Sequence, residues 1–217
     1  MANMQPTTAR ALVSHGPYKT GGWKLQNISL RPLRENELLV EVIASGVCQT
    51  DLHFAGLESG HGVHYPRVMG HEGAGYVRQI GPNVTAARVD DPVLMSFSSC
   101  QTCECCRRGH PAHCHTFDPI NFESTSENYV FREEKEEGSA QSTDPDIFGQ
   151  FFGQSRFASW TIVQEEAVVN VSGLVEGREE LQLLAPLGCG IQTGAGAVIN
   201  AAGAKPEDSI AVLGLGG

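Results

Sequence analysis

The feature of this sequence that most limits its fold is a cluster of cysteines near the middle of the chain. Five of the seven cysteines lie within fifteen positions, and four of these follow the spacing C-x2-C-x2-C-x7-C: Cys100, Cys103, Cys106 and Cys114. A C-x2-C pair lets one tight turn present two sulfurs to one ion, and four thiolates complete the tetrahedral shell of a structural zinc ion. The spacing therefore predicts a closed structural zinc site in this segment.

A disulfide framework is the main alternative for cysteines crowded in this way. Such frameworks belong to secreted domains, whereas residues 1–10 are polar and lack the apolar stretch of a secretory signal. Cys105 is a spare thiol that could compete for the metal, and the histidines close to the cluster are interpreted as solvent-facing loop residues: His110, His113 and His115. We expect a reduced, cytoplasmic protein.

The charge balance excludes several classes of partner. With 15 basic and 25 acidic residues the chain has a formal net charge of −10, which repels nucleic-acid phosphates and anionic membranes. No apolar run approaches the roughly 20 residues that span a bilayer. We therefore expect small-molecule partners, and neither nucleic acid nor membrane.

The first three quarters of the chain have the texture of a β domain. Apolar and polar residues alternate with the period of strands, and Gly and Pro separate the segments, over residues 38–47, 74–80, 93–97 and 157–163. Many short strands with such turns predict a barrel or a sandwich. Residues 121–150 are polar and acidic, and we expect them to form an exposed loop.

The texture changes after Val171. Residues 179–184 and 187–202 suit helices, and Pro186 suits the first turn of the second helix. Residues 209–213, SIAVL, form a short apolar run that is typical of a buried parallel strand. This run leads into Gly214-Leu215-Gly216-Gly217, which begins the dinucleotide-binding pattern G-x-G-x-x-G.

Three further metal-binding side chains are far apart in sequence. Cys48 follows one predicted strand, His71 precedes another, and Cys189 opens the helical region. Two cysteines and one histidine would leave the fourth zinc position open, as in catalytic rather than structural sites. Spacing alone does not link the three residues, and a lone buried cysteine is usually a small hydrophobe.

Several motifs together resemble one enzyme family. The stretch from Gly70 to Val84, GHEGAGYVRQIGPNV, fits G-H-E-x2-G-x5-G-x2-V, which is similar to a motif of zinc-containing medium-chain alcohol dehydrogenases. The cysteine spacing and the segment APLGCGIQT, residues 185–193, resemble the same family. The resemblance implies a mainly β, GroES-like, partly open barrel as the catalytic domain over residues 1–183. It also implies the first helix and strand of an incomplete α/β Rossmann domain over residues 184–217.

The resemblance also assigns roles in the metal site. Cys48, His71 and Cys189 resemble the ligands of a catalytic zinc, beside the structural zinc of the four clustered cysteines. Asp51 looks like the carboxylate that orients the ligand histidine, and Glu72 looks like the acid behind the zinc. Two zinc ions per chain are therefore implied.

Proton transfer and cofactor binding are implied in the same way. Thr50 and His53 resemble a relay that carries the alcohol proton to solvent, for which a hydroxyl and an imidazole are suited. The residues that resemble cofactor-binding positions for NAD or NADP are Thr193, Gly214, Gly216 and Gly217. Gln49 stands where relatives often have a basic residue that contacts the pyrophosphate, so cofactor binding is expected to be weaker.

The implied activity is hydride transfer from a primary alcohol to NAD or NADP by a homo-oligomeric full-length enzyme. FFGQSRFASW, residues 151–160, looks like the aryl- and benzyl-alcohol dehydrogenase branch, which usually has serine where Arg156 stands; an aromatic alcohol is therefore favoured. The alternatives are a polyol or formaldehyde dehydrogenase and a non-enzymatic, zinc-stabilised GroES-like module. Since the chain stops inside the glycine turn, we expect the 217 residues alone to be inactive.

Overall fold

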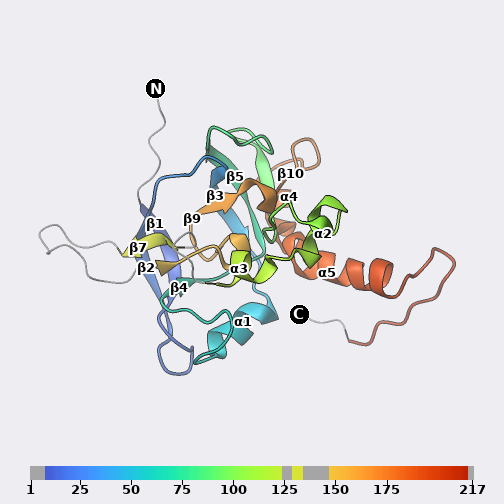
Figure 1. The fold of residues 1–217 in the computed structure, drawn as a ribbon, viewed down its shortest axis with the longest axis horizontal. Coiled ribbons are helices and arrows are strands. Elements are labelled where there is room, and N and C mark those ends of the chain that lie inside the picture. Colours follow the sequence, from blue (N-terminus) through green and yellow to red (C-terminus); the bar gives the residue numbers. More distant parts are fainter. Residues whose placement is uncertain (1–7, 124–128, 134–146, 215–217) are drawn as a thin grey trace, which may run out of the picture.

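The structure is a computed structural model that describes residues 8–123, 129–133 and 147–214 (Figure 1). Its chain begins with an antiparallel pair, β1 (Thr8–Ser14) and β2 (Trp23–Leu30). The alternation in β1 turns Ala9, Ala11 and Val13 inward, where all three are buried. The hairpin thus supplies the first wall of the core.

β1 and β2 belong to a ring of five strands that closes on itself in the order β1-β2-β7-β8-β4. The remaining members are β4 (Arg67–Val68), β7 (Tyr129–Glu133) and β8 (Ile147–Phe148). β7 and β8 lie inside the segment predicted to be an exposed loop, and that prediction is wrong for both. Phe131, Ile147 and Phe148 are buried apolar side chains, and their burial outweighs the acidic composition around them. The run Glu134 to Glu137 lies outside the described residues.

A second, open sheet has the order β10-β6-β5-β3-β9 and is antiparallel throughout. Its strands are β3 (Glu37–Ser45), β5 (Gly73–Ile80), β6 (Pro92–Met95), β9 (Trp160–Gln164) and β10 (Val168–Asn170). The four strands predicted from alternation correspond to β3, β5, β6 and β9. The mainly β, GroES-like fold class is confirmed by the comparisons given below.

The core lies between the ring and the open sheet. Val13, Ile28 and Phe131 of the ring pack with Leu39 and Ile162 of the sheet, and all five are at most 1% exposed. Each such side chain contributes about 1.5–3 kcal/mol by leaving water. This packing holds the strand ends of the sheet in fixed positions, and the candidate site lies at those ends.

Short helices connect the strands. They are α1 (Gln49–Gly56), α2 (Glu104–Arg107), η1 (Pro111–His113), α3 (Phe117–Asn121), η2 (Phe151–Gly153) and η3 (Glu165–Ala167). α1 begins where Asp51, in its first turn, accepts a hydrogen bond from the backbone N–H of Cys48 at 3.0 Å. This is one half of a capping box. Among the described residues, no helix is long and apolar enough to cross a membrane.

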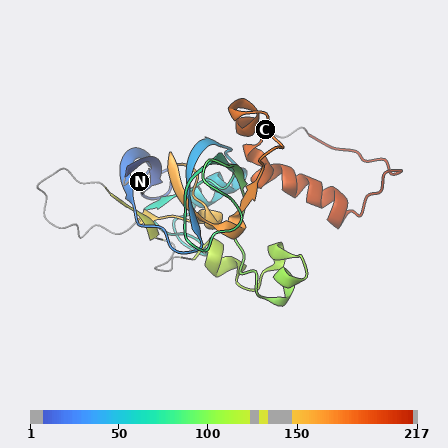
Figure 2. The ribbon, with the colours of Figure 1, turned by 90° about the horizontal axis from the view of Figure 1, so that it is seen from above.

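The last part of the chain is helical and leaves the β domain. It contains α4 (Arg178–Leu183), η4 (Ala185–Gly188), α5 (Gly190–Gly196) and the π-helical turn η5 (Ala197–Ala201). α5 and η5 together match most of the predicted helix 187–202. Figures 1 and 2 show the α5 helix projecting away from the sheets.

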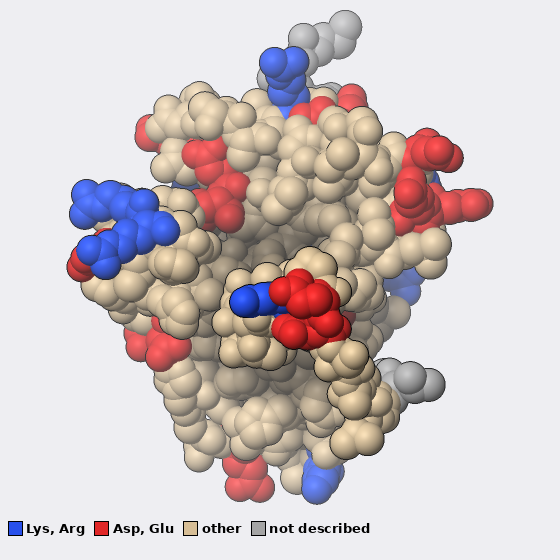
Figure 3. All heavy atoms as spheres, turned by 90° about the vertical axis from the view of Figure 1, so that its right-hand side faces the viewer, with Lys and Arg blue, Asp and Glu red and all other residues tan. Residues whose placement is uncertain are grey.

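The strand predicted over residues 209–213 is wrong, because the structure has no strand there. A strand needs a neighbour with which to form hydrogen bonds, and no described strand lies beside this segment. Its apolar side chains are exposed instead, with Leu213 98% exposed. Figure 3 shows the face on this side of the molecule, where charged side chains gather at the rim and in one group at the centre, with uncharged surface between them. Exposed apolar residues of this region are Ile191, Ile199, Ile210 and Val212.

Candidate metal centres

The structure brings four side chains with metal-binding atoms together at the ends of β3, β5 and β6. Cys48 follows β3, His71 and Glu72 precede β5, and Cys189 lies between η4 and α5. One potential ligand atom of each lies within 4.8 Å of the others. We call these four residues the first centre. Cys48, His71 and Cys189 were expected to converge, and Glu72 adds a carboxylate.

His71 is held in one orientation by Asp51. Its Nδ1 lies 3.2 Å from Oδ1 of Asp51, which also accepts the backbone N–H of Gly70 at 3.0 Å. The other ring nitrogen, Nε2, is buried and has no hydrogen-bond partner within the described part of the chain. With Nδ1 donating to Asp51, loss of the Nε2 proton would free a lone pair beside two thiols and a carboxylate. This donor set fits zinc, because an imidazole nitrogen and two thiolates are ligands that zinc prefers.

The electrostatics of the first centre favour an ionised thiol at Cys48. Burial raises the pKa of Cys48, but hydrogen bonds from Thr50 and the nearby imidazole of His71 outweigh it, and the net shift is downward. Burial lowers the pKa of His71, whereas Asp51 and the Cys189 thiol raise it, to about 10 in total. Without a metal, the raised pKa of His71 favours a proton on its ring beside these thiols, and a metal cation would take the place of that proton.

Glu72 is fixed behind the other members of the first centre. Its Oε1 accepts the backbone N–H of Gly190 at 2.9 Å, and its own carbonyl accepts the N–H of Gly46 at 2.8 Å. A Cβ at Gly46 would lie 2.0 Å from Oε2 of Glu72. Gly46 is therefore a position that only glycine suits, and sequence reasoning did not single it out.

The two residues predicted to relay protons lie on α1. Thr50 is beside the first centre, with its Oγ1 3.6 Å from Sγ of Cys48. His53 lies about one turn further along, exposed, with its ring against that of Phe54. Together with Gln49 and Leu52, His53 lines a hollow on the outer side of the helix. The order Thr50 then His53 thus runs from the first centre toward solvent.

A cavity of about 910 Å³ opens over the first centre. Its lining includes His71 and Cys189, the aromatic residues Phe97 and Phe152, and Ile199 and Thr193 of the α5 region. Phe152 stacks on the ring of His71, with 4.6 Å between centroids.

His110 and His113 also line this cavity. The interpretation of these two as loop histidines facing only solvent missed that position, although both are exposed. The sequence did offer one signal for this position. Both histidines lie between Cys106 and Cys114, and the loop held by these two cysteines lines the cavity together with α5.

The second centre consists of the four clustered cysteines, whose sulfurs all lie within 4.8 Å of one another. Sγ of Cys106 is 3.5 Å from that of Cys103 and 3.9 Å from that of Cys100. The backbone N–H of Cys100 donates to the sulfur of Cys114, and that of Cys103 donates to the sulfur of Cys100, both at 3.3 Å. Hydrogen bonds from Thr102 lower the pKa of Cys100 to about 5. Cys105 is not a member: its Sγ lies 3.5 Å from Nε2 of His115.

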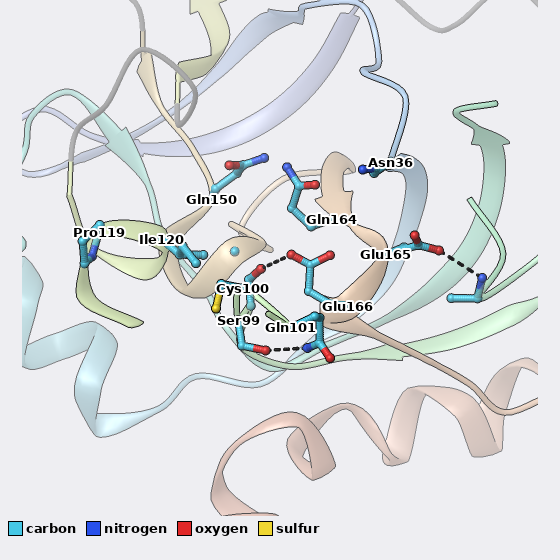
Figure 4. A pocket seen from close by; sticks show the side chains of 13 residues that line it. Asn36, Ser99, Cys100, Gln101, Pro119, Ile120, Gln150, Gln164, Glu165 and Glu166 are labelled. Carbon is cyan, nitrogen blue, oxygen red and sulfur yellow. Dashed lines mark hydrogen bonds between the residues drawn. The ribbon is translucent and has the colours of Figure 1, made fainter. Parts of the chain in front are cut away.

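Another hollow, of about 680 Å³, lies away from the first centre (Figure 4). Amide and carboxylate side chains dominate it, among them Gln150, Gln164 and Glu166. Oε1 of Glu166 accepts the hydroxyl of Ser98 at 2.8 Å. Burial raises the pKa of Glu166. This hollow shares no lining residue with the cavity over the first centre.

The residues expected to bind a cofactor are only partly described. Thr193 lies on α5 at the cavity over the first centre. Gly214 is exposed and has φ +84°, a conformation that suits glycine. Gly216 and Gly217 lie outside the described residues.

Comparison with known proteins decides the family. A family model described as the alcohol dehydrogenase GroES-like domain matches residues 34–173. The chain belongs to the zinc-type alcohol dehydrogenase family. Membership implies zinc and a nicotinamide cofactor in general terms, and it confirms the GroES-like fold.

The relatives that this chain matches are named for different substrates. Geraniol dehydrogenase of Castellaniella defragrans is 38% identical over 191 residues, which cover 84% of this chain and 45% of that protein. S-(hydroxymethyl)glutathione dehydrogenase of Escherichia coli is 34% identical over 215 residues, covering 96% and 53%.

A solved structure, benzyl alcohol dehydrogenase of Acinetobacter calcoaceticus, is 38% identical with a TM-score of 0.74, covering 89% of this chain and 48% of that one. The chain thus spans about half the length of the relatives it matches.

Proposed function

We propose that the protein containing this chain transfers a hydride from a primary alcohol to NAD or NADP. The first centre would hold a catalytic zinc through Cys48, His71 and Cys189, with Glu72 behind it, and the second centre would hold a structural zinc. The observation that carries this proposal is the buried Nε2 of His71, which has no hydrogen-bond partner among the described residues and belongs to a group with two thiols nearby. Bound zinc supplies Lewis acidity toward an alcohol or carbonyl oxygen.

The side chains around the first centre would orient a ligand, transfer the substrate proton and contact the cofactor. Asp51 keeps the imidazole of His71 in one tautomer, since its carboxylate accepts the Nδ1 proton. The hydroxyl of Thr50 would accept the substrate proton and donate its own onward to His53 at the surface. Thr193 would lie beside the nicotinamide. Gln49 carries no charge, so the charge-assisted hydrogen bond that a basic residue would make to the cofactor pyrophosphate would be missing.

We infer a flat, apolar alcohol as the substrate. Support comes from Phe97, Phe152 and Ile199 in the cavity wall and from the names of two relatives, geraniol dehydrogenase and benzyl alcohol dehydrogenase. Aromatic walls favour such a ligand because they bury its ring without leaving polar groups unpaired. The second candidate is S-(hydroxymethyl)glutathione, supported by the name of the Escherichia coli relative.

We also propose a division into two domains, a cellular compartment and an oligomeric state. Residues 1–183 would form the catalytic domain, and residues 184–217 would begin the cofactor domain, because the helical segment leaves the sheets there. Seven free cysteines suit a reducing compartment such as the cytoplasm. Sedimentation of the full-length protein would check the expected homo-oligomer.

Metal analysis and substrate profiling of the full-length protein test the proposal. Two zinc ions per chain are expected, together with reduced-cofactor absorbance when benzyl alcohol or geraniol is supplied with NAD or NADP. One zinc per chain and no turnover with any alcohol would favour the non-enzymatic scaffold. Turnover confined to S-(hydroxymethyl)glutathione would keep the dehydrogenase and replace the substrate class.

A further inference from the structure

A buried segment, Gln150–Arg156, lies directly behind the first centre. Its non-glycine residues Gln150, Phe152 and Ser155 have φ values of 63°, 54° and 59°, in the left-handed region that such residues rarely adopt. A backbone of this kind persists only where surrounding contacts fix it. One of those contacts reaches the residue before His71: the N–H of Arg156 donates to Gly70 O at 2.9 Å.

Gln154 makes the central contacts of this segment, and its side chain is fully buried. Its Nε2 donates to the carbonyl oxygen of His71 at 2.9 Å and to that of Ser96 at 2.6 Å. Its Oε1 accepts Nε–H of Arg156 at 2.8 Å. Both amide hydrogens are therefore used, and the amide has one orientation only, since a flip would place oxygen against two carbonyls.

The connection continues to the other side of the first centre. The hydroxyl of Ser96 donates to the carbonyl of Gly188 at 2.8 Å, and Gly188 immediately precedes Cys189. The backbones approach so closely here that a Cβ at Gly188 would lie 2.0 Å from Met95 O. Gln154 and Ser96 thus join the backbone of the ligand histidine to that of a ligand cysteine.

Arg156 fixes Gln154 at an energetic cost to the fold. Its guanidinium is buried, and neither Nη1 nor Nη2 has a hydrogen-bond partner among the described residues. Its stem occupies the place where Gly73 lacks a side chain, since a Cβ there would lie 2.5 Å from Cδ of Arg156. A buried, unpaired cation destabilises a protein, so folding alone gives no reason for an arginine here. Its one side-chain hydrogen bond among the described residues holds the Gln154 amide.

We propose that Gln154, anchored by Arg156, is a positioning residue that sets the separation of His71 and Cys189 and thereby the shape of the first centre. It touches neither substrate nor the ligand atoms, and acts through the backbone of His71 and through Ser96. Phe152 of the same segment stacks on the His71 ring, so the segment fixes both the backbone and the ring of this residue. The proposal rests on the proposed metal-binding function of the first centre.

Zinc release from the full-length protein to a chromogenic chelator tests the proposal. Gln154→Met removes both donors, and we expect about tenfold or more faster release from the first centre, the lower end of what losing a contact behind a metal ligand costs. Release from the second centre should stay unchanged, which makes it an internal reference. Replacing zinc by cobalt gives a second readout, because altered geometry at the first centre shifts the cobalt absorption bands.

Gln150→Met is the matched control. Gln150 is a buried glutamine in the same segment, but its Nε2 donates to Oε1 of Glu37 at 3.5 Å instead of to the backbone of His71. This variant should lose thermal stability without faster release from either centre. Equal release from wild type and Gln154→Met, or equal acceleration at both centres, would overturn the proposal. Wild-type protein with no zinc in its first centre would instead refute the proposed function.

Arg156→Met keeps the test decisive if Gln154→Met does not fold. This change removes a buried cation and leaves the Gln154 amide without its anchor. We expect unchanged or higher thermal stability together with faster release from the first centre. A purely structural role for Arg156 predicts lower stability and unchanged release, and that result would count against a positioning role.

Discussion

Nδ1 of His71 lies 3.2 Å from Oδ1 of Asp51, and both side chains are at most 1% exposed. The carboxylate also has a second partner: its other oxygen accepts the backbone N–H of Cys48 and caps the helix that begins there. One side chain therefore orients a histidine and fixes the backbone of a cysteine of the first centre. This relationship links the geometry of the first centre to the local fold of α1.

Replacing Asp51 by Asn should weaken metal binding at the first centre. The amide oxygen of asparagine can still accept hydrogen bonds, but its NH2 group cannot. The variant therefore loses the negative charge beside the His71 ring and one of the two acceptor oxygens that now bind His71 Nδ1 and the Cys48 N–H. We expect about 10–100-fold lower zinc affinity at this centre, measured by competition with a chelator of known affinity. Asp118→Asn, at an exposed site, serves as the control. Unchanged affinity in Asp51→Asn would contradict the orienting role.

Replacing a cysteine of the second centre should mainly lower stability, whereas replacing one of the first centre should mainly abolish turnover. Cys103→Ala should lower the free energy of unfolding by more than about 3 kcal/mol, because a structural zinc contributes directly to folding. Cys48→Ala should abolish turnover with a smaller loss of stability. Cys105→Ala, which lies outside the second centre, should change neither quantity. Thermal melts and zinc content of the three variants decide this, and similar melting temperatures for Cys103→Ala and Cys48→Ala would refute the division.

Gly46→Ala should displace Glu72. The added Cβ would lie 2.0 Å from Oε2 of this buried carboxylate, which is held from the other side by Gly190. Overpacking of this kind costs about 1–3 kcal/mol. Urea unfolding measures the loss. Gly177→Ala has no atom within 4 Å of its added Cβ and an extended φ of 171°, and should be neutral.

Glu166→Gln should stabilise the protein at neutral pH. Burial raises the pKa of Glu166 above its ordinary value of 4.5, so the folded state keeps a proton that the unfolded state has already released. Stability therefore falls as pH rises from about 4.5 through the raised pKa, and the loss is complete above it. Glutamine removes this dependence, and its carbonyl still accepts the Ser98 hydroxyl.

Melting temperatures at pH 4 and pH 7 check the sign of this effect. Glu166→Gln should melt higher than wild type at pH 7 and close to wild type at pH 4. The exposed Glu58→Gln should melt like wild type at both values. A variant that is less stable at pH 7 would show that the ionised carboxylate makes a favourable contact.

His53→Ala in the full-length enzyme should slow alcohol oxidation most at neutral and lower pH. Its position on α1, about one turn from Thr50, places it between the first centre and solvent. Hydroxide can accept the proton directly at high pH, so the defect should shrink there. The exposed His61→Ala is the control. A defect of the same size at every pH would argue against a relay.

The second centre could be predicted from spacing because all four cysteines lie within fifteen positions, and short chain lengths limit where they can go. The first centre could not. Cys48, His71 and Cys189 meet because β3 and β5 are antiparallel neighbours and the η4 turn packs beside the end of β6, which only pairing between distant strands establishes. Family resemblance found these residues, whereas periodicity gave only the strands.

Other features escaped prediction for physical reasons. β7 lies in an acidic segment whose composition favours solvent, yet burial of Phe131 in the ring determines its structure. Residues 209–213 have the composition of a strand but lack a described neighbour. Arg156 stood out only as a departure from the serine usual in the resembled branch. Gln154 gave no local signal, since its contacts reach His71 and Ser96, which are more than 50 residues away.

The pairing of Ser45 with Gly73 fixes how the ends of β3 and β5 meet, and β3 reaches this alignment only after two irregularities in register. Side chains in strands alternate between faces, so pairing one residue out of step would turn His71 away from the cysteines. A misaligned molecule would then have hydrogen-bonded strands and a filled core but no place for the ion. With zinc bound as proposed, the zinc content of the first centre would report the fraction of molecules in which β3 and β5 are correctly aligned.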